Sequence, residues 1–261
     1  CTQRLDASGQ TRPIEDGDRE ELAAQENEFA QQALRTLAFA RRVGAPESVD
    51  EGEQELEFLG RAIKNPERPY VAILGGAKVS DKIKVIESLL TRVDALLIGG
   101  AMAYTFELAK GGSVGGSLVE PDLADTAERI LASAEERGVK LLLPPDSVCA
   151  QSIAAGVETR VFPSGAIPDG WLGLDVGPRA VELFSRELAG ARTVFWNGPL
   201  GAFEIAPFDA ATNAAAAEAA RLTREGVLVS VAGGGDTVAA LNKAGAADDF
   251  TYISTAGGAF L

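Results

Sequence analysis

The chain of 261 residues contains no histidine and only two cysteines, Cys1 and Cys149. Without histidine, Ser-His-Asp and Cys-His nucleophiles and histidine-ligated zinc sites are excluded. The two cysteines lie far apart in the sequence, so we expect no disulfide framework and a reducing, cytoplasmic location. Because no imidazole can activate it, Cys149 is expected to be a small buried side chain.

Long apolar runs and net positive charge are also lacking. No run is long enough to cross a bilayer and no signal peptide opens the chain, so we expect no membrane association. The formal charge is −14, which opposes binding to nucleic acid or to an anionic membrane. A nucleotide remains compatible with this charge, because its site needs only a local cluster of positive groups.

Glycine, in contrast, is abundant, with 29 residues. Many of them cluster in four turns, each of which follows an apolar, strand-like run. Parallel strands end at one edge of a sheet, glycine lets the backbone approach a phosphate, and the next helix directs its free amides there. The four turns therefore predict a nucleotide site. They contain Gly75 and Gly76, Gly99 and Gly100, Gly233 to Gly235, and Gly257 and Gly258.

Strand and helix patterns alternate from Tyr70 onward. This order predicts an α/β fold with a Rossmann-like parallel sheet of about six strands and helices on both faces. The stretch 145–175 is expected to be rich in loops, with a short strand at 158–162. The expected strands are 71–74, 94–98, 139–143, 193–196, 226–231 and 252–253. The expected helices are 80–91, 102–110, 121–137, 179–188, 208–224 and 237–243.

The first 50 residues differ in pattern, and they predict a helical segment that precedes the sheet. Helices are expected at about 18–42 and 51–64. The division is then a helical head at 1–50, a joining helix at 51–69 and an α/β domain at 70–261.

Two lysines follow the first glycine turn. Lys78 and Lys82 are four residues apart, so on a helix their ammonium groups would share one face near its N-terminus. There they would suit an anion. The alternative is a pair of solvated lysines, with Lys82 paired to Asp81 or Glu87.

Two acidic residues also allow two interpretations. Asp236, before Thr237, is either a helix N-cap or a ligand of a Mg²⁺ carried on phosphates. Glu204, in the turn that follows Trp196, is either surface charge or an acceptor for ribose hydroxyls. The segment 173–178 has the same ambiguity.

Several of these motifs together resemble one family. The segments are Ile73-Leu-Gly-Gly-Ala-Lys-Val-Ser-Asp-Lys82, Ile98-Gly-Gly-Ala-Met-Ala-Tyr-Thr-Phe106, Gly170-Trp-Leu-Gly-Leu-Asp-Val-Gly-Pro178, Trp196-Asn-Gly-Pro-Leu-Gly-Ala-Phe-Glu204, Gly233-Gly-Gly-Asp-Thr237 and Ile253-Ser-Thr-Ala-Gly-Gly-Ala259. In order and spacing they resemble the C-terminal, nucleotide-binding lobe of phosphoglycerate kinase. That glycolytic family transfers a phosphoryl group between 1,3-bisphosphoglycerate and Mg-ADP.

The resemblance implies roles for individual residues. As catalytic groups it implies Lys78 and Lys82 at the nucleotide phosphates and the amides of Gly257 and Gly258 at the transferring phosphoryl. Glu204 would hold the ribose, and Asp236 would meet the magnesium of Mg-ADP or Mg-ATP. The remaining residues implied at the nucleotide are Gly75, Gly76, Gly99, Gly100, Leu174, Asn197, Pro199, Gly234, Gly235 and Thr237.

The family's acceptor lobe, with its arginine-rich cradle, has no counterpart in this sequence. We therefore expect 3-phosphoglycerate or 1,3-bisphosphoglycerate to bind only if that lobe is supplied, and the chain alone to lack turnover. The alternatives are a non-catalytic nucleotide-binding module and an inert fusion fragment. Residues 1–43 resemble part of the nucleotide-binding domain of a P-type cation-transporting ATPase, or form an unrelated amphipathic helix.

Overall fold

The computed structural model of the chain describes residues 3–5, 11–13 and 65–254. The chain divides into two units, residues 1–53 with residue 260, and residues 54–259 with residue 261. In the first unit, β1 (Gln3–Leu5) pairs antiparallel with β2 (Thr11–Pro13). These strands were not predicted, because three residues are too few to show an alternating pattern. The helices expected at 18–42 and 51–64 lie outside the described residues.

The second unit is built on a parallel sheet of six strands, as the sequence predicted. Their order is β13-β12-β11-β3-β4-β6. In β3, β4 and β11 every residue is buried, which explains why these runs show no alternation of polar and apolar residues. The six strands are β3 (Tyr70–Leu74), β4 (Ala95–Ile98), β6 (Lys140–Leu142), β11 (Thr193–Asn197), β12 (Val229–Gly233) and β13 (Tyr252–Ser254).

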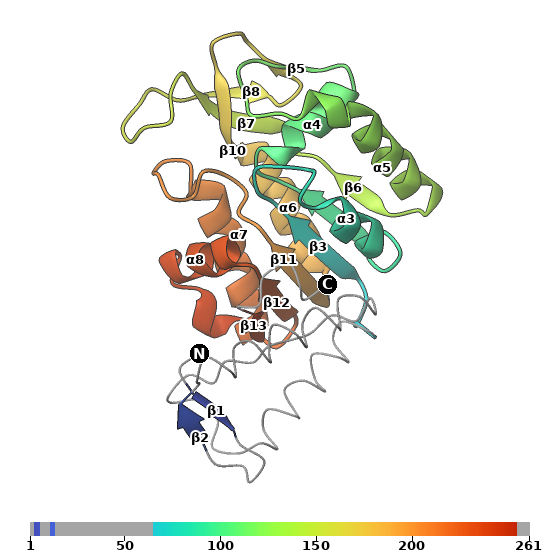
Figure 1. Cartoon of the computed structure of the whole chain (residues 1–261), viewed down its shortest axis with the longest axis vertical. Coiled ribbons are helices and arrows are strands. Elements are labelled where there is room, and N and C mark those ends of the chain that lie inside the picture. Colours follow the sequence, from blue (N-terminus) through green and yellow to red (C-terminus); the bar gives the residue numbers. More distant parts are fainter. Residues whose placement is uncertain (1–2, 6–10, 14–64, 255–261) are drawn as a thin grey trace. The chain divides into compact units, whose positions relative to one another are not determined.

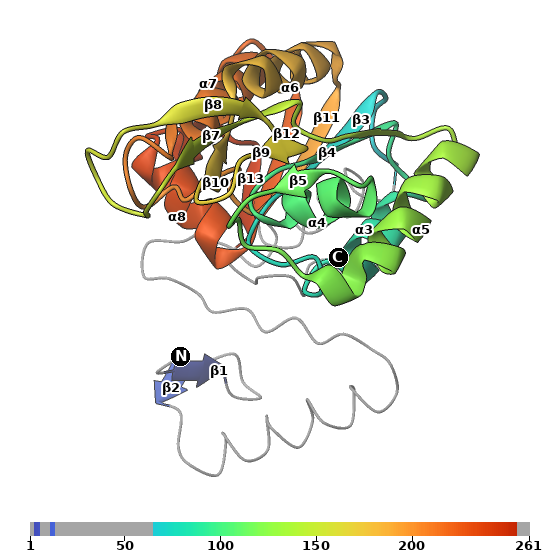
Figure 2. The same ribbon diagram turned by 90° about the horizontal axis from the view of Figure 1, so that it is seen from above.

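Helices cover both faces of this sheet (Figure 2). Val71, Ile73 and Trp196 point to the face where α6 (Pro178–Gly190) and α7 (Ala210–Arg224) join the same apolar core. Helix α8 (Gly235–Lys243) adds Leu241 to that core. The opposite face carries the helices α3 (Ile83–Leu89), α4 (Met102–Ala109) and α5 (Ala124–Glu136).

Strands β3 and β11 are parallel neighbours, but the direction in which successive strands are added to the sheet reverses between them. Successive strands run outward from β3 to β4 and β6, and outward on the other side from β11 to β12 and β13 (Figure 1). The chain after β3 and the chain after β11 therefore lead to helices on opposite faces, α3 and α7. Such a switch point leaves a crevice beyond the carboxyl ends of the strands, where ligands of open α/β sheets bind.

A smaller antiparallel sheet, with the order β10-β7-β8, flanks this edge (Figure 1). It consists of β7 (Asp146–Ala150), β8 (Arg160–Pro163) and β10 (Leu172–Val176). Nearby, β5 (Ser113–Val114) pairs with β9 (Ala166–Ile167). The loop-rich interpretation of 145–175 was therefore incomplete: residues 151–159 form a loop and a short strand lies near 160 as expected, but β7, β9 and β10 were missed. Asp, Ser and Gly in β7 and β10 weaken the local strand signal, and tertiary pairing overrides it.

Cys149 is fully buried in β7. Burial raises the pKa of its thiol to about 12, so the thiol stays protonated at neutral pH, as expected for an inert side chain. Among the helices of the described ranges, none is long and apolar enough to cross a bilayer.

Candidate functional site

The glycine turns after β3 and β11 interlock through their backbones. Gly75 N–H donates to the Asn197 carbonyl at 3.0 Å, and Gly76 N–H donates to the Pro199 carbonyl at 3.0 Å. A Cβ atom on Gly75 would lie 1.9 Å from the Pro199 oxygen. Only glycine therefore permits this contact between the two loops at the switch point.

The turn after β4 joins the same cluster. Gly100 N–H donates to the Leu200 carbonyl at 2.9 Å. Gly100 has a φ of +67°, and a Cβ atom there would lie 2.5 Å from the Gly76 nitrogen. A Cβ atom on Gly99 would meet the Leu200 side chain at 2.4 Å. The three loops thus form one close-packed floor. The shared strand edge was predicted from the sequence, but the contacts between the loops were not.

The turn after β12 leads directly into α8. Gly234 has a φ of +98°, a backbone conformation that favours glycine. Gly235 and Asp236 occupy the exposed first turn of α8, where backbone N–H groups have no acceptor within the helix. Helix α8 begins at Gly235, two residues earlier than expected. Its first amide dipoles point to the edge of the sheet.

Thr237 is buried, and its hydroxyl is already engaged. It accepts from Gly198 N–H at 2.7 Å and donates to the Gly233 carbonyl at 2.8 Å. The Asn197 side-chain nitrogen donates to the same carbonyl at 2.7 Å. Asn197 and Thr237 therefore lock the ends of β11 and β12 together, and the backbone amide of Thr237 is the group left for an anion.

The lysine prediction was right about proximity to a helix start and wrong about a shared helical face. Residues 79–82 form a turn, in which Lys82 N–H donates to the Val79 carbonyl at 2.8 Å, and α3 begins only at Ile83. Lys82 is partly buried and its ammonium donates to the Asn197 side-chain oxygen. Lys78 is exposed on the preceding loop. The helix was expected to start at residue 80, three residues too early, because the sequence Ser80-Asp81-Lys82 is compatible with both a turn and the first turn of a helix.

Burial lowers the pKa of Lys82, while the charges of Asp81 and Asp236 act in the opposite direction. Desolvation of an ammonium group without a full counter-charge is unfavourable. A bound anion beside Lys82 would relieve that cost.

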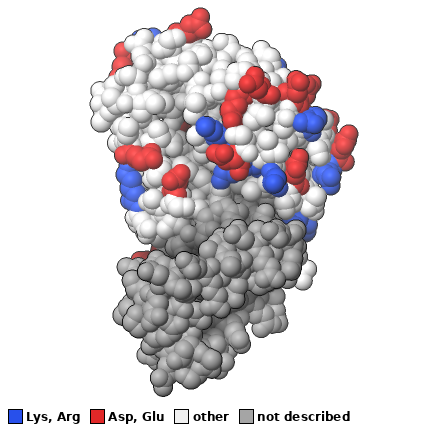
Figure 3. Space-filling model, in the orientation of Figure 1, with Lys and Arg blue, Asp and Glu red and all other residues white. Residues whose placement is uncertain are grey.

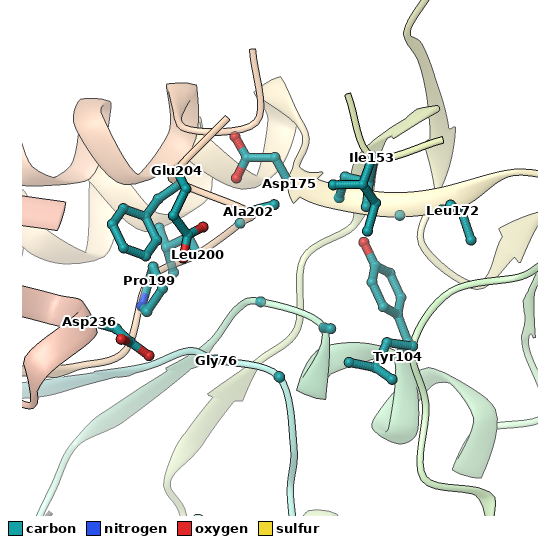
Figure 4. A pocket seen from close by; sticks show the side chains of 18 of the residues that line it. Gly76, Tyr104, Ile153, Leu172, Asp175, Pro199, Leu200, Ala202, Glu204 and Asp236 are labelled. Carbon is teal, nitrogen blue, oxygen red and sulfur yellow. The ribbon is translucent and has the colours of Figure 1, made fainter. Parts of the chain in front are cut away.

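A cavity of about 410 Å³ opens beside these loops. Figure 4 shows Asp236 and Glu204 toward one end and Tyr104 and Ile153 toward the other. Six residues that the sequence singled out line it: Gly76, Gly100, Leu174, Pro199, Glu204 and Asp236. The other predicted site residues that the structure describes do not line the cavity. They lie in the three packed loops, around the turn of residues 79–82, or at the ends of β11 and β12 and the start of α8: Gly75, Lys78, Lys82, Gly99, Asn197, Gly234, Gly235 and Thr237.

Sequence reasoning missed much of the apolar wall. Tyr104, on α4, packs on the backbone of β10, and a Cβ atom on Gly173 would lie 2.1 Å from its hydroxyl oxygen. Leu118 and Ile153 line the cavity from two separate loops and are 52% and 57% exposed. For Tyr104, its position shortly after Gly100 was a signal in the sequence that it lies near the site. Leu118 and Ile153 reach the cavity only through tertiary structure, so no signal in the sequence pointed to them.

The segment 173–178 was considered from the sequence, but Asp175 was not singled out. It is 2% exposed and lines the cavity. Its carboxylate accepts N–H bonds from Val176 and from Ala211, in the first turn of α7, both at 2.9 Å. Burial raises the pKa of Asp175 to about 7 despite these bonds, and the charge of Asp209 adds to the shift.

A magnesium ion fits this site only as a companion of phosphates. Asp236 and Glu204 are both exposed, and within the part of the chain that the structure describes, no three Asp, Glu, Cys or His side chains form a metal-binding group. One carboxylate near a triphosphate or diphosphate is a usual arrangement for Mg²⁺.

Comparison with known proteins supplies an independent result. The phosphoglycerate kinase family model matches residues 52–261. The phosphoglycerate kinases of Thermus thermophilus and Rhizobium meliloti are each 58% identical over 209 residues, or 80% of this chain. That alignment covers 53% and 52% of those proteins, so the chain spans about half the length of the curated relatives it matches.

Solved structures agree. Phosphoglycerate kinase from Coxiella burnetii superposes with a TM-score of 0.76 at 42% identity, covering 80% of this chain and 52% of that one. The enzyme from Pyrococcus horikoshii gives a TM-score of 0.65 at 31% identity with the same coverage. The match begins at residue 52, so the ATPase-like interpretation of residues 1–43 stays a prediction. From residue 52 onward, family model, relatives and fold agree, and the chain belongs to the phosphoglycerate kinase family.

Proposed function

We propose that this chain binds ADP or ATP with magnesium and serves as the nucleotide-binding lobe of a phosphoglycerate kinase. The observation that carries the proposal is the cavity at the switch point, which has an apolar wall toward Tyr104 and the Lys82 and α8 groups beside its other end. A nucleoside diphosphate has the same polarity, with an apolar base at one end and anionic phosphates at the other.

The base fits the apolar end of the cavity. Leu174, Pro199 and the backbone of Gly76 and Gly100 line the same cavity and are proposed contacts of the nucleotide. Glu204 then accepts from the ribose hydroxyls. This orientation places the phosphates toward Lys78 and Lys82.

The phosphate end combines charge with oriented dipoles. Lys82 supplies an ammonium whose pKa is lowered by burial, and Gly235 to Thr237 supply first-turn amides. Asp236 holds the magnesium, which neutralises part of the phosphate charge when it is bound. Gly99, Gly75, Asn197 and Gly234 build the support beneath these groups.

Gly257 and Gly258 lie outside the described residues. Ser254 of β13 pairs with Gly233 of β12 in a parallel register, so β12 and β13 end at the same edge of the sheet. This register supports the proposal that the amides of Gly257 and Gly258 meet the transferring phosphoryl group.

The proposed reaction is phosphoryl transfer between 1,3-bisphosphoglycerate and ADP. Such transfer depends mainly on positioning and on electrostatic stabilisation, and this chain's residues would hold the donor side of it. The acceptor requires a second lobe, which agrees with the chain spanning about half of its relatives.

We therefore propose a head at 1–50, a joining helix at 51–69 and a nucleotide-binding domain at 70–261, with no turnover by this chain alone. Without the acceptor lobe, the chain acts as a nucleotide-binding module.

The charge distribution supports the exclusion of polyanionic partners. Figure 3 shows basic and acidic side chains interspersed over the region of α3 and α5. With a net charge of −14, we propose that neither nucleic acid nor an anionic membrane is a partner.

Thermal unfolding tests the proposal, because a ligand that binds only the folded state raises the midpoint. Millimolar Mg-ADP should raise the midpoint, and magnesium chloride at equal ionic strength should not. An unchanged midpoint with Mg-ADP would contradict nucleotide binding.

A further inference from the structure

Glu120 lies beside the nucleotide cavity without lining it, and its carboxylate holds the middle of the lysine loop, defined here as residues 77–82. Oε2 accepts from Ser80 N–H at 3.0 Å, and Oε1 accepts from the Ser80 hydroxyl at 2.6 Å. Ser80 lies midway between Lys78 and Lys82. Both lysines are therefore two residues from a point fixed by two charge-assisted hydrogen bonds.

Glu120 is itself held from behind. Its N–H donates at 3.1 Å to the hydroxyl of Thr105, which is 1% exposed on α4. The short helix η1 (Pro121–Leu123) begins at the next residue. The carboxylate thus extends from a backbone anchored on α4, a helix whose neighbouring Tyr104 lines the cavity.

The segment Ser117–Glu120 connects the two ends of the site. At its start the Ser117 hydroxyl accepts from Gly173 N–H at 2.9 Å, which ties it to the cavity wall on β10. Leu118, in its middle, lines the cavity. At its end Glu120 holds Ser80. One short segment therefore joins the wall proposed for the base to the loop proposed for the phosphates.

Glu120 carries its negative charge at neutral pH. Partial burial raises the pKa of its carboxyl, but bonds from the Ser80 hydroxyl and from the Ser80 and Val79 amides, with the charge of Lys78, outweigh burial and lower the pKa. The acceptor function is thus available throughout the physiological range. A negative charge this close to Lys78 would oppose phosphate binding unless its hold on the loop is worth more than the repulsion.

We propose that Glu120 is a positioning residue that fixes the lysine loop through Ser80 and thereby sets the affinity for the phosphates of the bound nucleotide. The inference rests on the proposed nucleotide site. It goes beyond that site because Glu120 touches neither the base nor the phosphates and acts only through Ser80. Its effect is therefore confined to ligands that carry phosphates.

Calorimetry with two probes separates positioning from general structure. Mg-ADP reports on both ends of the site, and adenosine reports on the base end alone. Glu120→Ala should weaken Mg-ADP binding about tenfold, or ~1.4 kcal/mol, because the lysine loop loses both charge-assisted bonds that fix Ser80. Adenosine affinity should change less than twofold. Glu128→Ala, at an exposed position of α5, is the control and should change neither affinity.

Two conservative variants distinguish reach from charge. Glu120→Asp keeps the charge but is one methylene shorter, so it should resemble Glu120→Ala. Glu120→Gln keeps the length and one acceptor, so its loss should be smaller. In the double variant with Ser80→Ala, the Mg-ADP loss should be clearly less than the sum of the two single losses, as expected for residues acting as one unit.

Three results would overturn the inference. They are an equal loss of Mg-ADP and adenosine affinity, tighter Mg-ADP binding by Glu120→Ala or Glu120→Gln, and wild-type behaviour of Glu120→Asp. If Glu120→Ala does not fold, the Gln and Asp variants decide. If the folded wild-type chain binds neither probe, the proposed function itself is wrong. A wild-type chain that binds both probes, with variants whose ratio of Mg-ADP to adenosine affinity is unchanged, contradicts only the role of Glu120.

Discussion

The Lys82 ammonium donates a hydrogen bond to the side-chain oxygen of Asn197 across the switch point of the sheet. Asn197 in turn donates through its side-chain nitrogen to the Gly233 carbonyl at 2.7 Å. One amide side chain therefore joins the lysine loop, the end of β11 and the turn that starts α8. Lys82 is thereby held between two strand ends and near the charge of Asp236.

Lys82→Ala should weaken Mg-ADP binding more than Lys84→Ala. Lys82 is partly buried at the N-cap of α3, whereas Lys84 is exposed within that helix. A charge-assisted contact to phosphate contributes ~1.5–3 kcal/mol, which is roughly a ten- to hundred-fold change in dissociation constant. Calorimetric titration of both variants checks this, and equal effects would refute the assignment of Lys82.

Gly75→Ala should destabilise the fold. The added Cβ atom would lie 1.9 Å from the Pro199 carbonyl oxygen, which is backbone and can move only with the loop. Overpacking of this kind costs about 1–3 kcal/mol, so the urea midpoint should fall. Gly190→Ala is the matched control, because nothing lies within 4 Å of its added Cβ atom. A Gly75 variant as stable as the Gly190 variant would show that the loops are not packed as described.

Asp175→Asn should change how stability depends on pH. The pKa of Asp175 is raised from 3.8 to about 7 in the folded chain, so the folded state retains a proton that the unfolded state releases. The resulting contribution is complete below pH 3.8 and is lost as the pH rises through 7. Asparagine does not ionise, so the free energy of unfolding of the variant should improve relative to wild type between pH 5 and pH 8. Parallel urea-unfolding profiles at the two pH values would contradict the raised pKa.

The chain alone should show no phosphoglycerate kinase turnover. Transfer requires donor and acceptor in line, and such positioning supplies ~7–11 kcal/mol of rate enhancement. The net charge of −14 also opposes the approach of an anionic acceptor. A coupled assay with 3-phosphoglycerate and Mg-ATP should stay at background, and a separately supplied acceptor lobe should restore some rate. Robust turnover by the purified chain would contradict the proposal that a second lobe is required.

Local sequence predicted the features that local physics determines. The strand expected at 71–74 is confirmed as Tyr70–Leu74. It was predictable because an apolar run without alternation is typical of a parallel strand covered on both faces. Glycines at 75, 76, 99 and 100 predicted turns at one edge of the sheet. The structure adds that Gly75 and Gly100 lie too close to the backbone of neighbouring loops for any larger residue.

What the sequence left open depends on distant neighbours. Strands β7 and β10 are held by pairing partners more than 20 residues apart. The raised pKa of Asp175 requires burial beneath α7, and the role of Glu120 requires a partner 40 residues away. The start of α3 at Ile83 was missed because the Val79–Lys82 turn continues the helical pattern.

Calorimetric titration of the folded wild-type chain with Mg-ADP tests the central claim most directly. The account predicts saturable binding with a stoichiometry near one, abolished or strongly weakened in Lys82→Ala. Absence of binding heat at two temperatures and millimolar Mg-ADP, on protein shown to be folded by circular dichroism, would contradict the account.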